Sequence, residues 1–194
     1  MREMLKLFIA VTLFSAFAGG LLAAVRVGTL ERIEYQKLKF VKGPTILQIL
    51  DGCSNDPLAD RIKITDGDRE RDFYIGEFNG QKNTVAFESF GSGFGGDIGV
   101  IVAVNLENDK IVGVGVTTHK ETPGVGARVK TEPAFSSQFK DVPIKEPFKL
   151  KADGGKFDAL SGATVSSRGV CAALVDLAKI YMRLKNEILQ KLKA

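Results

Sequence analysis

The longest regular pattern of apolar and polar positions lies near the C-terminal end of the chain. Between residues 166 and 192, apolar side chains recur at spacings of three and four, at Val170, Leu174, Leu177, Tyr181, Leu184, Ile188 and Leu192. Residues with this spacing share one face of an α-helix. Polar residues fall mostly on the opposite face, at Lys179, Arg183, Asn186 and Lys193. The pattern therefore predicts an amphipathic helix whose apolar face packs on a core.

Short runs rich in Val, Ile and Phe between about residues 73 and 118 predict strands, at Asn83–Phe90, Asp97–Leu106 and Lys110–Thr118. The polar turn 107–109 has the length needed to join the last two strands in a hairpin. Farther along, residues 132–139 predict a short helix, and runs at 148–152 and 156–160 predict a second hairpin around Asp153-Gly154-Gly155. Together these elements predict an α+β fold, a mostly antiparallel sheet packed with helices.

The N-terminal region predicts one transmembrane helix. Residues 7–25 read LFIAVTLFSAFAGGLLAAV and carry no charge between Lys6 and Arg26, and a membrane-spanning helix needs about 20 such residues. The alternative is a cleaved signal peptide, because Ala16-Phe17-Ala18 resembles a cleavage site. The apolar run continues past that site, which favours an uncleaved anchor. We expect an anchor over residues 1–28, a helical or loop connector over 29–60, and the α+β domain over 61–194.

Composition excludes several classes of function. The chain has 27 Lys and Arg against 23 Asp and Glu, with no dense basic run, so nucleic-acid binding is not expected. No metal site is predicted, because His119, Cys53 and Cys171 lack the spacing of metal ligands. Cys171 is interpreted as a small buried residue of the C-terminal helix, and a disulfide with Cys53 is left open. No serine hydrolase is expected, because the chain has no G-x-S-x-G elbow.

A glycine-rich stretch at residues 91–96, GSGFGG, matches the pattern G-x-G-x-x-G. In a dinucleotide-binding fold this pattern opens a helix, whereas here residues 97–102 continue as a predicted strand. A dinucleotide site is therefore not expected. Two interpretations stay open: the glycines form a tight structural turn, or they form one wall of a ligand pocket.

Two further segments carry candidate chemistry. In Glu121–Gly126, ETPGVG, the proline restricts the backbone and the glycines free their neighbours, which is typical of a rigid and specific loop. In Leu160–Gly169, LSGATVSSRG, the small residues before Thr164 leave its hydroxyl unshielded, and Ser166 or Ser167 is predicted to cap the helix that follows. The free N–H groups and positive dipole of a helix start stabilise an anion. Thr164 is therefore either a phosphate contact or attachment point, or part of an ordinary helix entry.

The membrane span, the segment His119–Gly126 and the segment Ser161–Ser167, in this order, resemble the FMN-binding domain family of ion-translocating respiratory complexes, and look most like the G subunit of the Rnf complex. In that family a flavin transferase links FMN by a phosphodiester bond to the threonine of S-G-A-T, which matches Thr164. The resemblance therefore implies covalent FMN on Thr164 and an FMN-binding domain over residues 61–194. It implies a flavin pocket that also includes Glu121, Thr122, Gly124, Val125, Ser161, Gly162, Ala163 and Val165.

Two details bear on this resemblance. Asp158 fits the acidic position of the sequence that the transferase recognises. Val125 stands where the family commonly has leucine, but both residues are apolar and suit packing against a flavin.

The resemblance implies an electron-transfer protein without a complete active site of its own. It would relay single electrons within an Rnf-type complex, which moves electrons between ferredoxin and NAD and couples this to Na⁺ or H⁺ transport. The implied partners are the other membrane subunits, the flavin transferase during maturation, and membrane lipid. A covalent flavin suits the outer face of the membrane, where no flavin pool is expected, although the charges around the span leave the orientation open.

The alternatives are the C subunit of the sodium-translocating NADH:quinone reductase, whose known members are longer, a lone FMN-domain sensor, and a membrane-tethered binding module without a covalent cofactor.

Overall fold

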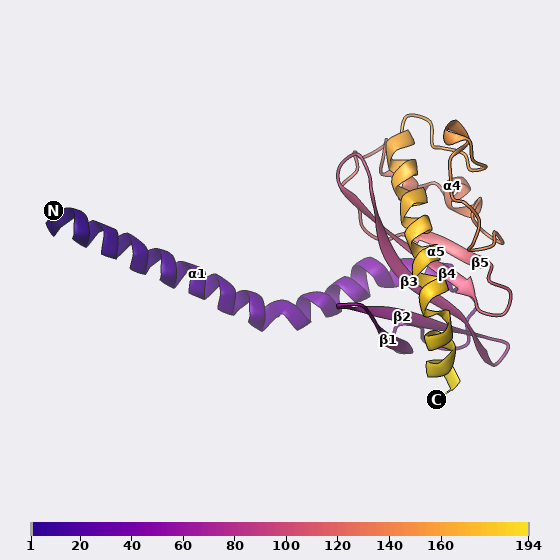
Figure 1. Cartoon of the computed structure of the whole chain (residues 1–194), viewed down its shortest axis with the longest axis horizontal. Coiled ribbons are helices and arrows are strands. Elements are labelled where there is room, and N and C mark those ends of the chain that lie inside the picture. The colour runs from indigo at the N-terminus through magenta and orange to yellow at the C-terminus, as the bar shows by residue number, and fades with distance from the viewer. Residues whose placement is uncertain (1, 194) are drawn as a thin grey trace. The chain divides into compact units, whose positions relative to one another are not determined.

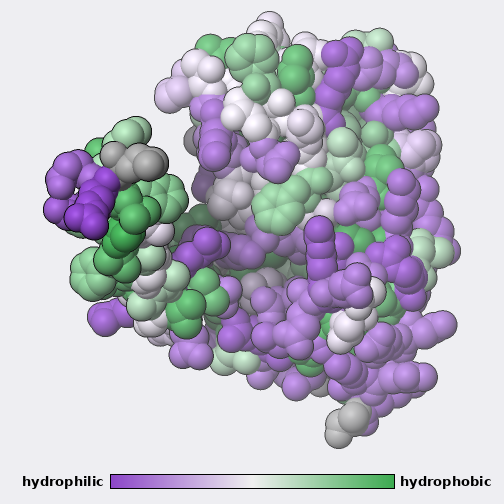
Figure 2. Space-filling model, turned by 60° about the vertical axis from the view of Figure 1, so that its left-hand side comes forward, coloured by the Kyte–Doolittle hydropathy of each residue, from purple (hydrophilic) through white to green (hydrophobic). Residues whose placement is uncertain are grey.

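The computed structural model describes residues 2–193, and the chain divides into two compact units between Phe40 and Val41. Helix α1, Arg2–Lys37, makes up nearly all of the first unit and has no buried residue (Figure 1). Apolar side chains cover most of its visible surface in Figure 2. Within the described residues, one N-terminal helix is long and apolar enough to cross a membrane, in agreement with the predicted span. The predicted domain boundaries at residues 28 and 60 stay predictions.

The second unit is built on a five-stranded antiparallel sheet in which each strand pairs with the next along the chain. The strands are β1 Arg61–Asp66, β2 Arg69–Phe78, β3 Gln81–Ser92, β4 Asp97–Asn105 and β5 Ile111–Val116. The hairpin predicted around residues 107–109 is confirmed as the connection between β4 and β5. β1 and the first part of β2 were not predicted. The α+β fold with an antiparallel sheet is confirmed.

Helix α5, Thr164–Lys193, packs across one face of the sheet, mainly on β3 and β4 (Figure 1). Its predicted apolar face is confirmed, since all but one of the seven residues are buried and Leu192 is partly buried. Close to the start of α5, a Cβ on Gly91 would lie only 1.9 Å from the carbonyl oxygen of Gly169. The helix backbone therefore lies directly on β3 here, and this contact sets the position of the first turns of α5.

The opposite face of the sheet is covered by the short helix α2, Gly43–Ile49, which follows the π-helical turn η1, Leu38–Lys42. Ile46 and Leu50 are buried on this face. Small residues on β5 make the approach of α2 possible, because a Cβ on Gly115 would lie 2.2 Å from the methyl group of Thr45. The sheet is thus covered on both faces within the second unit.

The segment after the sheet differs in part from the sequence-based expectation. The short helix expected at residues 132–139 is confirmed as α4, Pro133–Ser137, and a further short helix that was not predicted, α3 Arg128–Thr131, precedes it. The second predicted hairpin is wrong: residues 148–160 contain the 3-10 turn η2, Lys151–Asp153, and one isolated parallel bridge between Leu150 and Phe157. The reason is packing, because four phenylalanine rings from this region contact one another in the core, at Phe135, Phe139, Phe148 and Phe157. The N–H groups of Asp153 and Gly155 both donate to the carbonyl oxygen of Leu150 at 2.9 Å, so the chain turns tightly here instead of forming two paired strands.

Candidate functional site

Thr164 is the first residue of α5, so the helix begins two residues earlier than predicted. A tight turn precedes it, in which Gly162 has a φ of +78° and the N–H of Ala163 donates to the carbonyl oxygen of Leu160 at 2.9 Å. Only glycine adopts this backbone conformation at no steric cost. Thr164 itself is half-buried, while Ser161, Gly162 and Val165 are exposed and Ala163 is buried. The predicted site residues of this segment therefore lie around the entry of one helix.

The predicted capping role of Ser166 and Ser167 is wrong, because both residues lie inside the first turn of α5. Ser167 is fully buried, and its hydroxyl accepts from the N–H of Leu160 at 3.1 Å and donates to the carbonyl oxygen of Ala163 at 2.9 Å. These bonds fix the turn before the helix instead of capping it. The first N–H groups of an α-helix have no partner within the helix, so the helix start beside the Thr164 hydroxyl is suited to an anion.

A buried carboxylate joins this helix to two other segments. Glu121 is only 5% exposed. Its Oε1 accepts from the N–H of Gly95 at 2.8 Å, and its Oε2 accepts from the hydroxyl of Ser166 at 2.5 Å. The glycine-rich turn between β3 and β4, the ETPGVG loop and the first turn of α5 therefore meet at one side chain. The structure thus brings together the three segments that the sequence singled out separately.

The glycine-rich turn is both a tight turn and a wall of this junction. The N–H of Gly93 donates to the carbonyl oxygen of Gly96 at 2.8 Å, which closes the turn between the strands. A Cβ on Gly93 would lie 2.4 Å from Glu121 Oε1, and one on Gly95 would lie 2.1 Å from the carbonyl oxygen of Lys120. The first interpretation left open by the sequence, a tight turn, is therefore confirmed, whereas the second, a wall of a ligand pocket, stays a prediction.

The ETPGVG loop exposes most of its predicted site residues. Thr122, Gly124 and Val125 are exposed, whereas Glu121 is buried. The carbonyl oxygen of Thr122 accepts from the N–H groups of Val125 and Ala127, at 3.2 and 3.1 Å, and Gly124 has a φ of +73°. The loop is thus a closed turn that presents Val125 outward.

Three exposed apolar side chains come from the three segments that meet at Glu121. Phe94 from the glycine-rich turn is 77% exposed, Val125 from the loop is 45% exposed, and Val165 from α5 is 44% exposed. The sequence patterns did not single out Phe94. The available signal was an aromatic residue held between glycines in a turn, a position where burial in a core is not expected.

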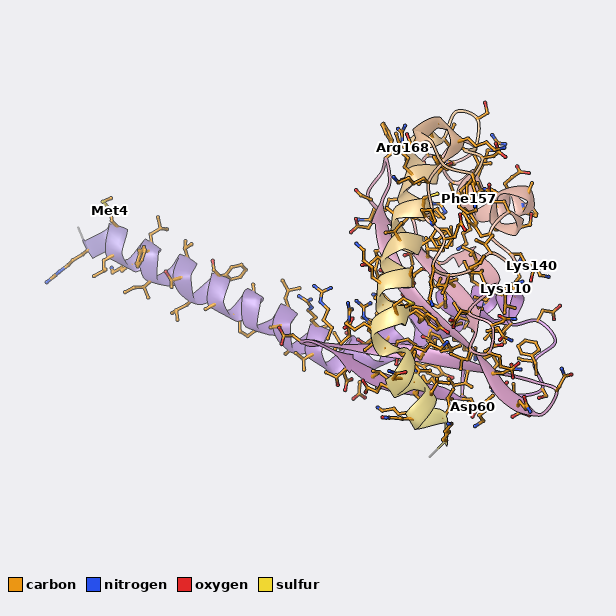
Figure 3. All side chains as sticks on the ribbon, turned by 45° about the vertical axis from the view of Figure 1, so that its right-hand side comes forward. Met4, Asp60, Lys110, Lys140, Phe157 and Arg168 are labelled. Carbon is orange, nitrogen blue, oxygen red and sulfur yellow. The ribbon has the colours of Figure 1, made fainter. Side chains whose placement is uncertain are left out.

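Charged side chains lie close to the turn before Thr164. Arg128 donates from Nη1 to the carbonyl oxygen of Ser161 at 3.3 Å and from Nη2 to Glu132 at 3.4 Å. Arg168, near the start of α5 in Figure 3, makes two hydrogen bonds to Asp153, at 2.8 and 2.7 Å. These bonds hold the pKa of the Asp153 carboxyl below its ordinary value.

Asp158, an acidic residue six positions before Thr164, is exposed and forms an ion pair with Lys151 at 2.7 Å. Its N–H donates to Gln138 Oε1 at 2.7 Å, and its carbonyl oxygen accepts from Gln138 Nε2 at 3.1 Å. Asp158 is therefore accessible, and Gln138 holds its backbone in place.

Two other features lie apart from this junction. Cys53 and Cys171 are free thiols, and Cys171 is buried in α5 as predicted. A cavity of about 400 Å³ lies between α2, β5 and α4. None of the predicted site residues lines it, and its lining also includes Val129 and Lys130 of α3 and Val170 of α5.

Comparison with known proteins places these features in a family. The sequence model of the FMN-binding domain family matches residues 93–179, a range that contains both Glu121 and Thr164. The G subunit of the ion-translocating oxidoreductase complex of Pseudomonas aeruginosa strain UCBPP-PA14 is 31% identical, covering 89% of this chain and 86% of its own length. The protein of the same name from Methanosarcina acetivorans is also 31% identical, covering 89% of this chain and 92% of its own length.

Solved structures support the fold. The C subunit of the Na⁺-translocating NADH-quinone reductase of Parabacteroides distasonis superposes with a TM-score of 0.56 at 20% identity, covering 79% of this chain and 96% of that one. Shewanella oneidensis NqrC superposes with a TM-score of 0.52 at 28% identity, covering 62% of each chain.

Proposed function

Because this chain belongs to the family of G subunits of ion-translocating oxidoreductase complexes and contains an FMN-binding domain, we propose that it carries FMN in a phosphodiester bond to Thr164. It is an electron-transfer component of an oxidoreductase complex, anchored by an N-terminal apolar helix. The proposal adds the covalent link and the role within an Rnf-type complex that exchanges electrons between ferredoxin and NAD.

The observation that carries the proposal is the junction at Glu121. It joins the first turn of α5, which begins at the half-buried Thr164 and has a start suited to a phosphate, to a glycine-rich turn and a closed loop. The apolar side chains of Phe94, Val125 and Val165 are exposed on the same three segments. An FMN molecule has these two needs, a site for its phosphate and apolar surface for its ring system. The residues present therefore fit the group.

Different residues of the chain would bind the phosphate and the ring system of FMN. Thr164 Oγ holds the phosphate, and Ser161, Gly162 and Ala163 form the turn that leaves this hydroxyl open. Thr122, Gly124, Val125 and Val165 provide exposed surface for the ring, and Phe94 adds an aromatic face. Bound FMN accepts and releases single electrons, and the surrounding protein sets its potential through packing and hydrogen bonds.

We further propose that the domain lies on the outer face of the membrane, in contact with membrane lipid through α1 and with the other membrane subunits of the complex. The exposed residues Asp158, Ser161 and Gly162, close to Thr164, would be recognised by the flavin transferase during maturation. A protease added to intact cells should then remove the domain. Cleavage only from the cytoplasmic side of inverted vesicles would contradict this topology.

The redox role is tested with the purified full chain after co-expression with a flavin transferase. Its visible absorption should show flavin bands that bleach on addition of a reductant and return on reoxidation. A protein that carries no flavin after this co-expression, or whose flavin is not reversibly reduced, would contradict the proposed function.

A further inference from the structure

The buried carboxylate of Glu121 lies between the glycine-rich turn and α5, which suits a structural link better than direct contact with a flavin. We infer that it is a positioning residue, whose carboxylate fixes the glycine-rich turn relative to the first turn of α5 and so fixes Phe94 relative to Thr164. The inference rests on the proposed function for the identity of the group that is positioned. It changes the role expected for Glu121 from a lining residue to a link between two walls of the pocket.

Both carboxylate oxygens are already used within the protein. Oε1 accepts from the N–H of Gly95 at 2.8 Å, Oε2 accepts from the hydroxyl of Ser166 at 2.5 Å, and the residue is 5% exposed. Hydrogen bonds to an ionised acceptor are stronger than those between neutral groups. A carboxylate in this state has little surface left to offer a bound molecule.

The glycines around the carboxylate support the same role. A Cβ on Gly126 would lie 2.5 Å from Oε2 and 2.7 Å from the Ser166 hydroxyl, and a Cβ on Gly93 would lie 2.4 Å from Oε1. None of these distances leaves room for a side chain. Close packing around Glu121 and Ser166 therefore explains glycine at position 126, and close packing against Glu121 and Ile98 explains glycine at position 93.

The link matters because it connects the residues proposed for the two ends of FMN. Phe94 lies in the turn, next to Gly95, and Thr164 lies two residues before Ser166 in the same helical turn. Without the carboxylate, the turn and α5 lose these two bonds that join them. The turn could then move relative to Thr164 while α5 stays docked on the sheet.

The test uses the full chain in detergent micelles, with and without co-expressed flavin transferase. The variants are Glu121→Ala, Glu121→Gln and Ser166→Ala, and Glu107→Ala in the exposed turn between β4 and β5 is the matched control. Glutamine retains the link, since its carbonyl oxygen can accept from Gly95 and its amide can donate to Ser166. Circular dichroism establishes that each variant folds.

The first measurement is amide hydrogen exchange in the flavin-free protein. In Glu121→Ala the N–H of Gly95 should exchange at least about tenfold faster, because a hydrogen bond to a charged group contributes more than the equivalent of tenfold in an equilibrium. Glu121→Gln, which keeps a neutral hydrogen bond to this N–H, should exchange more slowly than Glu121→Ala. Unchanged exchange at Gly95 in Glu121→Ala would overturn the inference.

The second measurement is made on the flavin-loaded protein. Flavin should still be attached to Glu121→Ala after denaturation, but in the folded variant its fluorescence anisotropy should fall and its quenching by iodide should rise. Glu121→Gln should restore both values, and Glu107→Ala should change neither. If Glu121→Ala does not fold, Ser166→Ala, which removes one of the two bonds, should show the same changes in smaller size, and their absence there would refute the inference.

The two proposals fail in different ways. If the unsubstituted chain carries no covalent flavin, the proposed function is wrong, while hydrogen exchange still tests the link. If flavin is attached but its mobility is the same in all folded variants, the positioning role is wrong and the proposed function stands.

Discussion

Replacing Gly91 by alanine should destabilise the domain at the contact that places the start of α5. A Cβ at this position would lie 1.9 Å from the carbonyl oxygen of Gly169 and 2.9 Å from the backbone nitrogen of Ala173. Ordinary contact begins at 3.4 Å, so β3 and α5 must separate by about 1.5 Å, the difference between 3.4 and 1.9 Å. Neither partner can relax by rotating a side chain, because both atoms belong to the backbone.

The expected loss is about 2–3 kcal/mol, the upper part of the range for overpacking a core. For a domain of this size the midpoint of thermal unfolding should fall by about 4–12 °C. The assay is thermal unfolding of the full chain in micelles, followed by circular dichroism. Ser92→Ala, at the exposed neighbouring position, is the control and should change the midpoint little.

Gly169→Ala provides a graded comparison. Its Cβ would lie 2.8 Å from the carbonyl oxygen of Ser92, which requires a separation of about 0.6 Å, and alanine is favoured over glycine inside a helix by about 1 kcal/mol. It should therefore destabilise less than Gly91→Ala. A Gly91→Ala midpoint equal to that of Ser92→Ala, or a larger loss for Gly169→Ala, would refute the packing argument.

Two further predictions concern titration. Hydrogen bonds from Arg183 and Arg71 hold the pKa of the Asp66 carboxyl below its ordinary value. The ionised Asp66 therefore stabilises the fold above the unfolded pKa of about 4. This contribution to stability is lost as the pH falls through the lower pKa of the folded state. Asp66→Asn should therefore lower the stability at pH 7 and flatten the loss of stability below about pH 4 in acid unfolding curves; equal slopes for the two proteins would argue against this. Burial, with a smaller effect of Asp153, raises the pKa of Cys171 to about 12. Iodoacetamide at about pH 8 should therefore label the half-buried Cys53 first. Faster labelling of Cys171, detected by mass spectrometry, would contradict the packing of α5.

Local periodicity was sufficient to predict the main elements. The spacing of Val170, Leu174 and Leu177 predicted the buried face of α5, and the apolar runs around residues 97–118 predicted the β4–β5 hairpin. β1 and the start of β2 were missed because they are rich in charged residues, as in RIKITDGDRERDF. Most of these side chains are exposed or half-buried, and only the buried residues, such as Ile64 and Phe73, indicate that the segment is a strand.

Interactions between distant residues explain what periodicity did not predict. The run 148–160 has the composition of a hairpin, but its conformation depends on rings packing against Phe139, which lies elsewhere in the chain. Likewise, Ser166 looked like a helix cap because its partner, Glu121, lies 45 positions away. The candidate segments could be identified from the sequence, whereas their meeting at one carboxylate could not.

The central claim is that Thr164 carries FMN. The full chain, of 21.0 kDa, should be co-expressed with a flavin transferase, denatured in SDS and examined for flavin fluorescence on the gel, with the adduct located by mass spectrometry. We expect a fluorescent band for the unsubstituted chain and for the control Thr131→Ala at an exposed position. We expect no fluorescence for Thr164→Ala, although circular dichroism should show that this variant folds. A band that persists in Thr164→Ala, or no band in the unsubstituted chain, would contradict the claim.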